Sequence, residues 1–125
     1  MLDLEVRFAK ALPDHRFILW EGNPQTFEFS YVSPGAEGLL GYPRELWLTD
    51  PEFWCSVVVH PDDRHDAVAF CALATGNKLD HDFEYRARHR DGRLLWLHDV
   101  VKVIVGPRGV PVNLRGVMID VTDQH

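Results

Sequence analysis

Three long β-rich runs in the second half of the chain restrict its fold more than any other feature. They span residues 79–88, 94–105 and 112–121, and short turns at Asp91-Gly92 and Gly106-Pro107-Arg108-Gly109 join them. Strands joined this tightly must run antiparallel, because a parallel crossover needs a dozen or more residues. The sequence therefore predicts a three-stranded antiparallel meander in this part of the chain.

The first half supplies two more strands and several helices. Runs at 17–20 and 26–32 are rich in β-formers and flank a turn at 21–24. Prolines 34, 43 and 51 each predict a short helix, because the missing N–H of proline costs nothing at the first helical position. The expected fold class is α+β: a five-stranded antiparallel sheet with short helices on one face.

One longer helix is predicted from His60-Pro61 to about Thr75. Asp62 and Asp63 lie in its first turn, where the helix dipole favours negative charge, and Gly76-Asn77 provides a stop. Its expected buried stripe consists of Ala67, Phe70, Cys71 and Ala74.

The first residues predict a separate amphipathic helix. Leu4, Phe8 and Leu12 recur at every fourth position, so we expect a capping or dimerisation helix over 1–13 and one domain over 14–125. The run 94–105 is apolar on both faces, and its outer face needs a cover. We expect a homodimer that uses this helix and the outer sheet face; the alternative is a cap on the chain's own sheet.

Charge and cysteine content exclude several classes of protein. A net charge of −6 disfavours direct nucleic-acid binding, which needs a basic surface. No apolar run approaches the roughly 18 residues of a membrane span, and no leader resembles a signal peptide. Cys55 and Cys71 lie among apolar residues, which indicates buried free thiols. We expect a cytoplasmic protein without direct membrane insertion.

Five motifs, in order, resemble those of the PAS family. They are Tyr31-Val32-Ser33-Pro34 leading to Leu40-Gly41-Tyr42, His60-Pro61-Asp62-Asp63-Arg64, Phe83-Glu84-Tyr85-Arg86, Asp91-Gly92 before Trp96, and Gly116-x-x-x-Asp120-Val121-Thr122. The resemblance covers about 17–122. It implies a PAS fold and a sensory or regulatory input module of a larger bacterial signalling protein. The implied output is a GGDEF diguanylate cyclase first and a histidine kinase second.

The last apolar strand points to the same role. It leads into Asp120 and Thr122, and the sequence stops three residues later. In the PAS family this step marks the exit to a signalling helix, so the resemblance implies that Asp120 and Thr122 couple the signal to a downstream output domain of the same polypeptide. The alternative function is a ligand-free protein–protein interaction module.

No group of residues predicts catalysis or a metal site. His60 and His65 are five positions apart, whereas two ligands on one helix face are four apart. Ser33 precedes a proline like a helix N-cap, and Ser30 and Ser56 lack the Gly-x-Ser-x-Gly context of a nucleophile. We therefore expect no catalytic residues in the domain itself.

The cofactors of known PAS domains do not match either. Flavin-binding members carry a cysteine in a Gly-x-Asn-Cys-Arg-Phe-Leu motif, which this sequence lacks. Haem-binding members can use a histidine of the long helix, but His65 points away from the predicted buried stripe. A small organic ligand, or none, is expected.

A ligand would lie between the inner sheet face and the short helices, as the resemblance implies. Strand alternation places Phe83 and Tyr85 inward. A two-residue turn at Asp91-Gly92 would add Trp96 and His98, whereas a three-residue turn with left-handed Gly92 would add Leu95, Leu97 and Asp99. We prefer the second register, because the first sets Glu84 opposite Asp99. The pocket candidates are Phe53, Trp54, Phe70, Phe83, Tyr85, Leu97 and Asp99; the alternative is that these residues are plain core.

Overall fold

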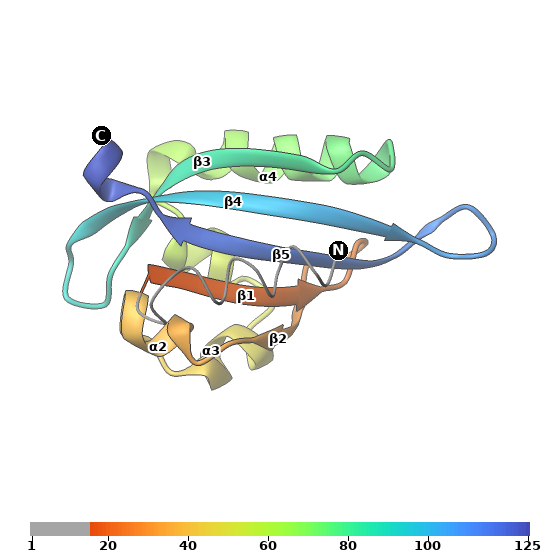
Figure 1. Cartoon of the computed structure of the whole chain (residues 1–125). Helices are drawn as coiled ribbons and strands as arrows, with labels where there is room; N and C mark the ends of the chain where they lie inside the picture. The colour runs from red at the N-terminus through yellow and green to blue at the C-terminus, as the bar shows by residue number, and fades with distance from the viewer. Residues whose placement is uncertain (1–15) are drawn as a thin grey trace.

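The protein, seen in a computed structural model that describes residues 16–125, contains a single five-stranded antiparallel sheet. The strands lie side by side in the order β2-β1-β5-β4-β3 (Figure 1). Their bounds are β1 Phe17–Gly22, β2 Phe29–Val32, β3 His81–Arg88, β4 Leu94–Val105 and β5 Pro111–Asp120. The predicted sheet is confirmed, and β4 has the predicted bounds. The two halves of the chain meet where β1 pairs with β5.

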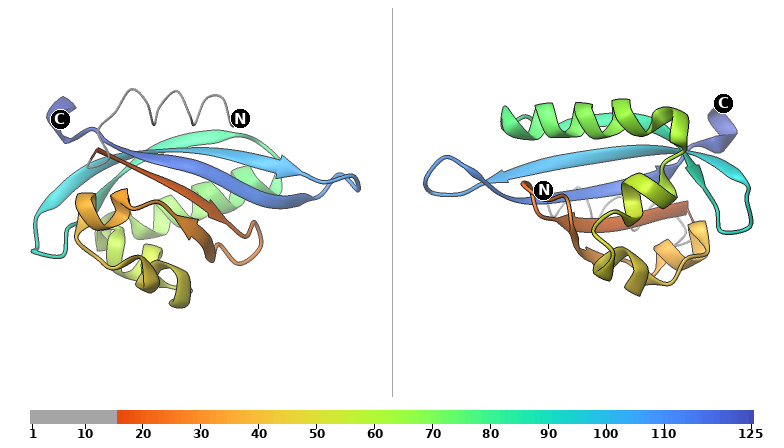
Figure 2. Two further views of the ribbon diagram at one scale, coloured as in Figure 1. Left: turned by 60° about the horizontal axis from the view of Figure 1, so that its bottom comes forward. Right: turned by 180° about the vertical axis from the view of Figure 1, so that it is seen from behind.

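The helices between β2 and β3 cover one face of this sheet (Figure 2). They are α2 Gly35–Leu40, α3 Arg44–Thr49, a π-helical segment η2 Trp54–Val58, and α4 Pro61–Gly76. A 3₁₀ turn, η3 Thr122–Gln124, follows β5. The α4 helix begins with Pro61 as predicted, and the His60 Nδ1 atom accepts a hydrogen bond from the backbone N–H of Asp62 at 3.1 Å.

The starts of the short helices differ from the prediction. Pro34 and Pro43 immediately precede α2 and α3, and the chain after Pro51 forms a turn before η2. Ser33 does not cap α2. Its hydroxyl accepts a hydrogen bond from the backbone N–H of Leu19 at 2.9 Å, so it prolongs the pairing of β1 with β2. The proline after Ser33 predicts a helix cap at this position. The Ser33 hydroxyl instead bonds to Leu19, which lies fourteen residues earlier on β1.

The preferred register of the β3–β4 hairpin is confirmed. Tyr85 pairs with Leu97 and Phe83 pairs with Asp99. Gly92 has φ 98°, a conformation that L side chains rarely adopt, and it closes a three-residue turn between His89 and Arg93. Leu95, Leu97 and Asp99 are consequently buried.

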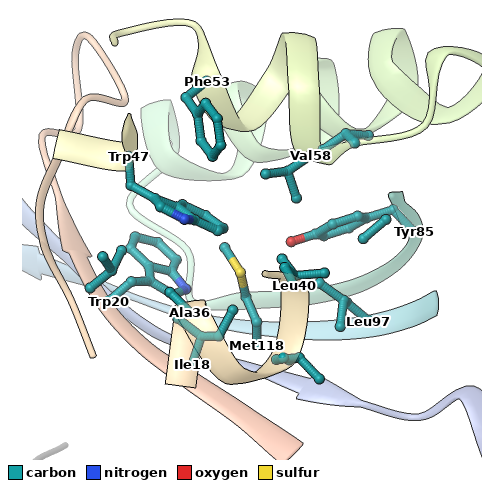
Figure 3. Close-up of a cluster of buried hydrophobic side chains, with 14 of the residues drawn as sticks. Ile18, Trp20, Ala36, Leu40, Trp47, Phe53, Val58, Tyr85, Leu97 and Met118 are labelled. Atoms are coloured by element: carbon teal, nitrogen blue, oxygen red, sulfur yellow. The ribbon is translucent and has the colours of Figure 1, made fainter. Parts of the chain in front are cut away.

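The core lies between the inner sheet face and the helices. Figure 3 shows Trp20, Trp47, Tyr85 and Met118 converging from different elements. Two predictions about burial are wrong. Phe70 is 44% exposed, because α4 packs along the narrow stripe Ala67, Cys71, Ala74 and Thr75, which leaves the Phe70 ring at its margin. Cys55 is only partly buried; Cys71 is buried, and both thiols are free.

The outer sheet face carries the alternate residues of β4, including the half-buried Val100 and Ile104. The predicted helix over 1–13, with Leu4, Phe8 and Leu12, lies outside the described residues. Within residues 16–125, no helix is long and apolar enough to cross a membrane.

Candidate functional site

A buried carboxyl group lies at the centre of the inner sheet face. Asp99 on β4 is only 2% exposed. The indole Nε1 of Trp20 donates a hydrogen bond to Asp99 Oδ1 at 3.0 Å, and the Tyr85 hydroxyl donates one to Oδ2 at 2.8 Å. The indole Nε1 of Trp54 in turn donates to the Tyr85 oxygen at 3.0 Å. A connected polar network therefore links β1, β3, β4 and η2 inside an otherwise apolar core.

Burial changes the acid–base behaviour of this network. Desolvation raises the pKa of Asp99 to about 7, although the hydrogen bonds from Tyr85 and Trp20 partly oppose it. Burial also raises the pKa of Tyr85, so its hydroxyl stays protonated and remains a donor. The Asp99 carboxyl group therefore changes charge near neutral pH, while the Tyr85 hydroxyl and the Trp20 indole keep the protons that they donate to it.

A small cavity lies against this carboxyl group. It has a volume of about 20 Å³, room for about one water molecule. Aromatic residues make up half of its lining, and the wall includes Trp20, Phe27, Trp54, Phe83, Cys71 and Asp99. The site combines an apolar enclosure with one convergent polar group, which is the usual composition of a small-molecule site.

A wider groove of about 150 Å³ lies next to this cavity, on the side of α4 and η2. Phe27, Trp54 and Cys71 line both hollows and so form the wall between them. Phe27 has φ 60°, a strained backbone conformation for an aromatic residue. Such strain is common at functional sites, and the strained residue here is the one whose ring lies between the cavity and the groove.

The Cys71 thiol faces a histidine but is not activated. Its Sγ atom lies 3.4 Å from His81 Nε2, while His81 Nδ1 lies 2.9 Å from the carbonyl oxygen of Leu79. Burial raises the pKa of Cys71 to about 12, so the thiol stays protonated. This pair is therefore a structural contact in the wall of the cavity.

Three of the predicted pocket residues, Trp54, Phe83 and Asp99, line the cavity. A fourth, Tyr85, is hydrogen-bonded to Trp54 and Asp99. Phe53 and Leu97 belong to the packed core, and Phe70 lines a separate shallow groove between α4 and β3. That any of them contacts a ligand stays a prediction. Sequence reasoning missed Trp20, Phe27, Phe29 and Cys71. Of these, Trp20 could have been found, because strand alternation along 17–20 places its side chain on the same face as Ile18, which is buried.

The predicted coupling residues form a compact joint at the end of β5. Asp120 Oδ1 accepts hydrogen bonds from the backbone N–H of Thr122 at 3.0 Å and from its hydroxyl at 2.5 Å. The Thr122 Oγ1 atom accepts from the backbone N–H of Trp96 at 3.1 Å, and the Val121 N–H donates to the Trp96 carbonyl at 2.9 Å. The chain leaving the sheet is thus fastened to β4 at Trp96.

The sequence and fold match known sensory proteins. A family model described as PAS fold matches residues 29–118. The N-terminal domain of a diguanylate cyclase with a PAS/PAC sensor from Marinobacter aquaeolei is 38% identical, with a TM-score of 0.81 over 88% of this chain and 99% of that one. That domain is the N-terminal domain of a protein named as a diguanylate cyclase.

Two curated relatives are similar at lower coverage. The two-component sensor PprA of Pseudomonas aeruginosa is 31% identical over 101 residues, 76% of this chain and 10% of that protein. A protein of Methylibium petroleiphilum named outer-membrane lipoprotein carrier protein is 31% identical over 94 residues, 74% of this chain and 46% of that one. The chain therefore spans less than half the length of either relative.

Proposed function

This chain belongs to the PAS family and is a sensory input module, and we propose that it senses a small molecule bound beside Asp99. In this proposal the signal passes through β4 and β5 to an output domain of the same polypeptide. The observation that carries the proposal is the buried carboxyl group of Asp99, with a pKa raised to about 7, against an aromatic cavity. Titratable groups shifted by burial and placed at a cavity are characteristic of functional sites.

The route to the output follows from the position of Asp99 on β4. Trp96 lies three residues away on the same strand, and its backbone N–H and carbonyl hold Thr122 and Val121. A ligand that shifts β4 at Asp99 therefore also moves the residues with which the chain leaves the sheet. Asp120 and Thr122 act in this proposal as the coupling joint.

The output domain is proposed from the relatives. A diguanylate cyclase is the first choice, supported by the Marinobacter protein, and the histidine kinase of a two-component system is the second, supported by the PprA sensor. The domain itself, over 14–125, has no catalytic role in this proposal and works in the cytoplasm.

Assembly forms a separate part of the proposal. The helix over 1–13, with Leu4, Phe8 and Leu12, joins the outer sheet face around Val100 and Ile104 in a homodimer. Sedimentation of the whole chain at micromolar concentration tests this, and a monomer would reject it.

A direct search for a bound molecule tests the sensory site. Native mass spectrometry and an absorbance spectrum of freshly purified protein should reveal a bound mass or a chromophore, or a thermal-shift screen should find a stabilising small molecule. Repeated absence of all three would reject ligand sensing and favour the alternative, a protein–protein interaction module with a filled core.

A further inference from the structure

The carboxyl group of Asp99 has acceptor positions to which no group within residues 16–125 donates a hydrogen bond. A carboxylate offers about four lone-pair positions, and Asp99 accepts two hydrogen bonds, from Trp20 and Tyr85. The group is 2% exposed and lines the inner cavity. A buried acceptor beside an unfilled space favours a ligand that donates hydrogen bonds, because desolvated charge is costly when it is not paired.

The size of the inner cavity restricts the group that donates. A volume of about 20 Å³ accepts a group about as large as one water molecule, such as a primary ammonium, and is too small for a ring or a branched group. The rings of Trp20, Phe27, Trp54 and Phe83 form part of the wall. Aromatic faces attract cations, and more strongly where water is excluded.

The charge of the lining agrees with a cationic ligand. Across the inner cavity and the adjoining groove, the charged side chains among the described lining residues are the acids Asp99 and Glu52; no lysine, arginine or histidine lines either hollow. An anionic ligand would meet two carboxyl groups without a compensating base. A neutral ligand would leave the Asp99 carboxylate without a counter-charge.

The groove provides space for the rest of the molecule. It shares Phe27, Trp54 and Cys71 with the inner cavity and continues past Val68 and Pro51, which are apolar. A short hydrocarbon chain attached to the buried group would pass between these shared residues into the groove. Phe27 lies in the turn between β1 and β2, whereas Trp54 is in η2 and Cys71 is in α4, so Phe27 is the shared wall residue that no helix or strand holds in place.

We propose that the ligand of this site is a small primary alkylamine, with its ammonium group against Asp99 and its carbon chain between Phe27 and Trp54. The inference rests on the proposed function, since it assumes that the cavity takes a ligand. It names the chemistry of that ligand from the size, the aromatic wall and the acidic lining of the two hollows.

Three probes of matched length test the charge requirement: pentylamine, 1-pentanol and pentanoate. Each is titrated calorimetrically into the whole 125-residue chain at about pH 8. We expect pentylamine to bind about tenfold more tightly than 1-pentanol, because hydrogen bonds to charged groups are stronger than neutral ones. Pentanoate should bind more weakly than either.

Substitutions place the binding at Asp99. Asp99→Asn keeps the shape of the side chain and removes its charge, so it should reduce the preference for pentylamine over 1-pentanol by about tenfold while 1-pentanol still binds. Glu45→Gln is the matched control, because Glu45 is an exposed acid on α3 that lines neither hollow. Glu52→Gln, at the groove, should weaken pentylamine by about twofold and tests the proposal even if Asp99→Asn fails to fold.

The pH dependence gives an independent measurement on the unchanged protein. Because the pKa of Asp99 is raised to about 7, pentylamine should bind more weakly at about pH 6 than at about pH 8, and binding near neutrality should release a proton. Tyr85 on β3 and Cys71 on α4 face Asp99 with raised pKa values and stay protonated over this range. His98 alternates to the opposite sheet face, where it contacts Asp82 at 2.7 Å, and Asp99→Asn leaves that pair intact.

The outcomes separate this inference from the proposed function. If 1-pentanol or pentanoate binds as tightly as pentylamine, or if Asp99→Asn keeps the preference for the amine, the cavity takes a ligand but the amine assignment is wrong. If the purified protein carries a different, non-amine molecule, the assignment is likewise wrong and sensing stands. If no probe binds, the amine assignment is wrong; if in addition no molecule copurifies and the thermal-shift screen finds none, both proposals fail.

Discussion

The indole ring of Trp20 lies directly over Gly116. A Cβ atom at position 116 would be 2.4 Å from Trp20 Cε2 and 2.6 Å from Nε1. Trp20 is on β1 and Asp99 is on β4, with β5 between them. The missing side chain at 116 therefore provides the space in which the indole crosses β5 and reaches Asp99.

Gly116→Ala should disturb both the packing and the polar network. The added methyl group must displace the indole, and overpacking of this kind lowers the free energy of unfolding by about 1–3 kcal/mol. Urea denaturation followed by circular dichroism measures the loss. Gly76→Ala is the control, because a Cβ there meets nothing within 4 Å and alanine favours a helix over glycine. Equal stability of the two variants would contradict the close approach of Trp20.

Asp99 should make the protein less stable as the pH rises from about 4 to about 7. The folded state keeps the proton up to about 7, whereas the unfolded chain releases it near the ordinary value of 3.8. Between these values the folded state binds more protons, so each increase in pH favours unfolding. The free energy of unfolding of wild type should fall relative to that of Asp99→Asn between about pH 4 and pH 7. Above about pH 7 the difference between the two should stay constant.

Denaturation at a series of pH values gives this difference, and carboxyl ¹³C chemical shifts report the titration of Asp99 directly. A midpoint below pH 4 would mean that the two hydrogen bonds outweigh burial, and would contradict the prediction.

The fold could be predicted from the sequence where its determinants are local. The α4 helix begins at Pro61 as expected. The register of the β3–β4 hairpin could be chosen from two features: Gly92 can adopt the left-handed conformation, and the other register would set Glu84 opposite Asp99. Both features depend on residues close together in the chain, whose conformational preferences are read from composition and spacing.

The candidate site was only partly predictable, because it is built from distant residues. Trp20 and Asp99 are 79 positions apart and meet across β5, a contact set by strand order rather than by any local pattern. Helical periodicity predicts Phe70 in the core, but periodicity marks only the apolar side of a helix and not how much of that side a neighbour covers. The strained Phe27 lies in a turn without periodicity.

Asp63→Asn should destabilise the protein at neutral pH. The Arg86 side chain donates hydrogen bonds to Asp63 at 2.7 and 3.0 Å, and its backbone N–H donates a third at 2.8 Å, so α4 is tied to β3. The loss should be about 1–2 kcal/mol in the free energy of unfolding, because the pair is only partly screened by solvent. Urea denaturation measures it, with Asp62→Asn as a control of equal charge change.

The pH dependence of this pair has the opposite sign from that of Asp99. The hydrogen bonds from Arg86 lower the pKa of Asp63 below 3.8. Its contribution is therefore complete above about 3.8 and is lost as the pH falls through the lower folded value. A difference between wild type and Asp63→Asn that persists unchanged in stronger acid would argue against the ion pair.

Asp120→Ala should leave the domain folded and uncouple it from its output. The substitution removes the acceptor of both Thr122 hydrogen bonds but no core side chain, so it should cost about 1 kcal/mol of stability. In the protein with its output domain, output activity should stop responding to the ligand. Asp123→Ala is the control, since the Asp123 side chain is 83% exposed and forms an ion pair with Arg16 at 3.5 Å. If Asp120→Ala unfolds the domain, Asp120 is structural and the coupling role is wrong.

The two thiols should react at very different rates with a thiol reagent. Cys55 is partly exposed, whereas Cys71 is buried and its pKa is raised to about 12, so its reactive thiolate is scarce. Treatment with N-ethylmaleimide at about pH 7 should label Cys55 first, and mass spectrometry of peptides identifies the site. Label at Cys71 then reports opening of the wall that it shares with Phe27 and Trp54. A ligand that fills the cavity should slow the labelling of Cys71 further, and equal rates at both cysteines would contradict the burial of Cys71.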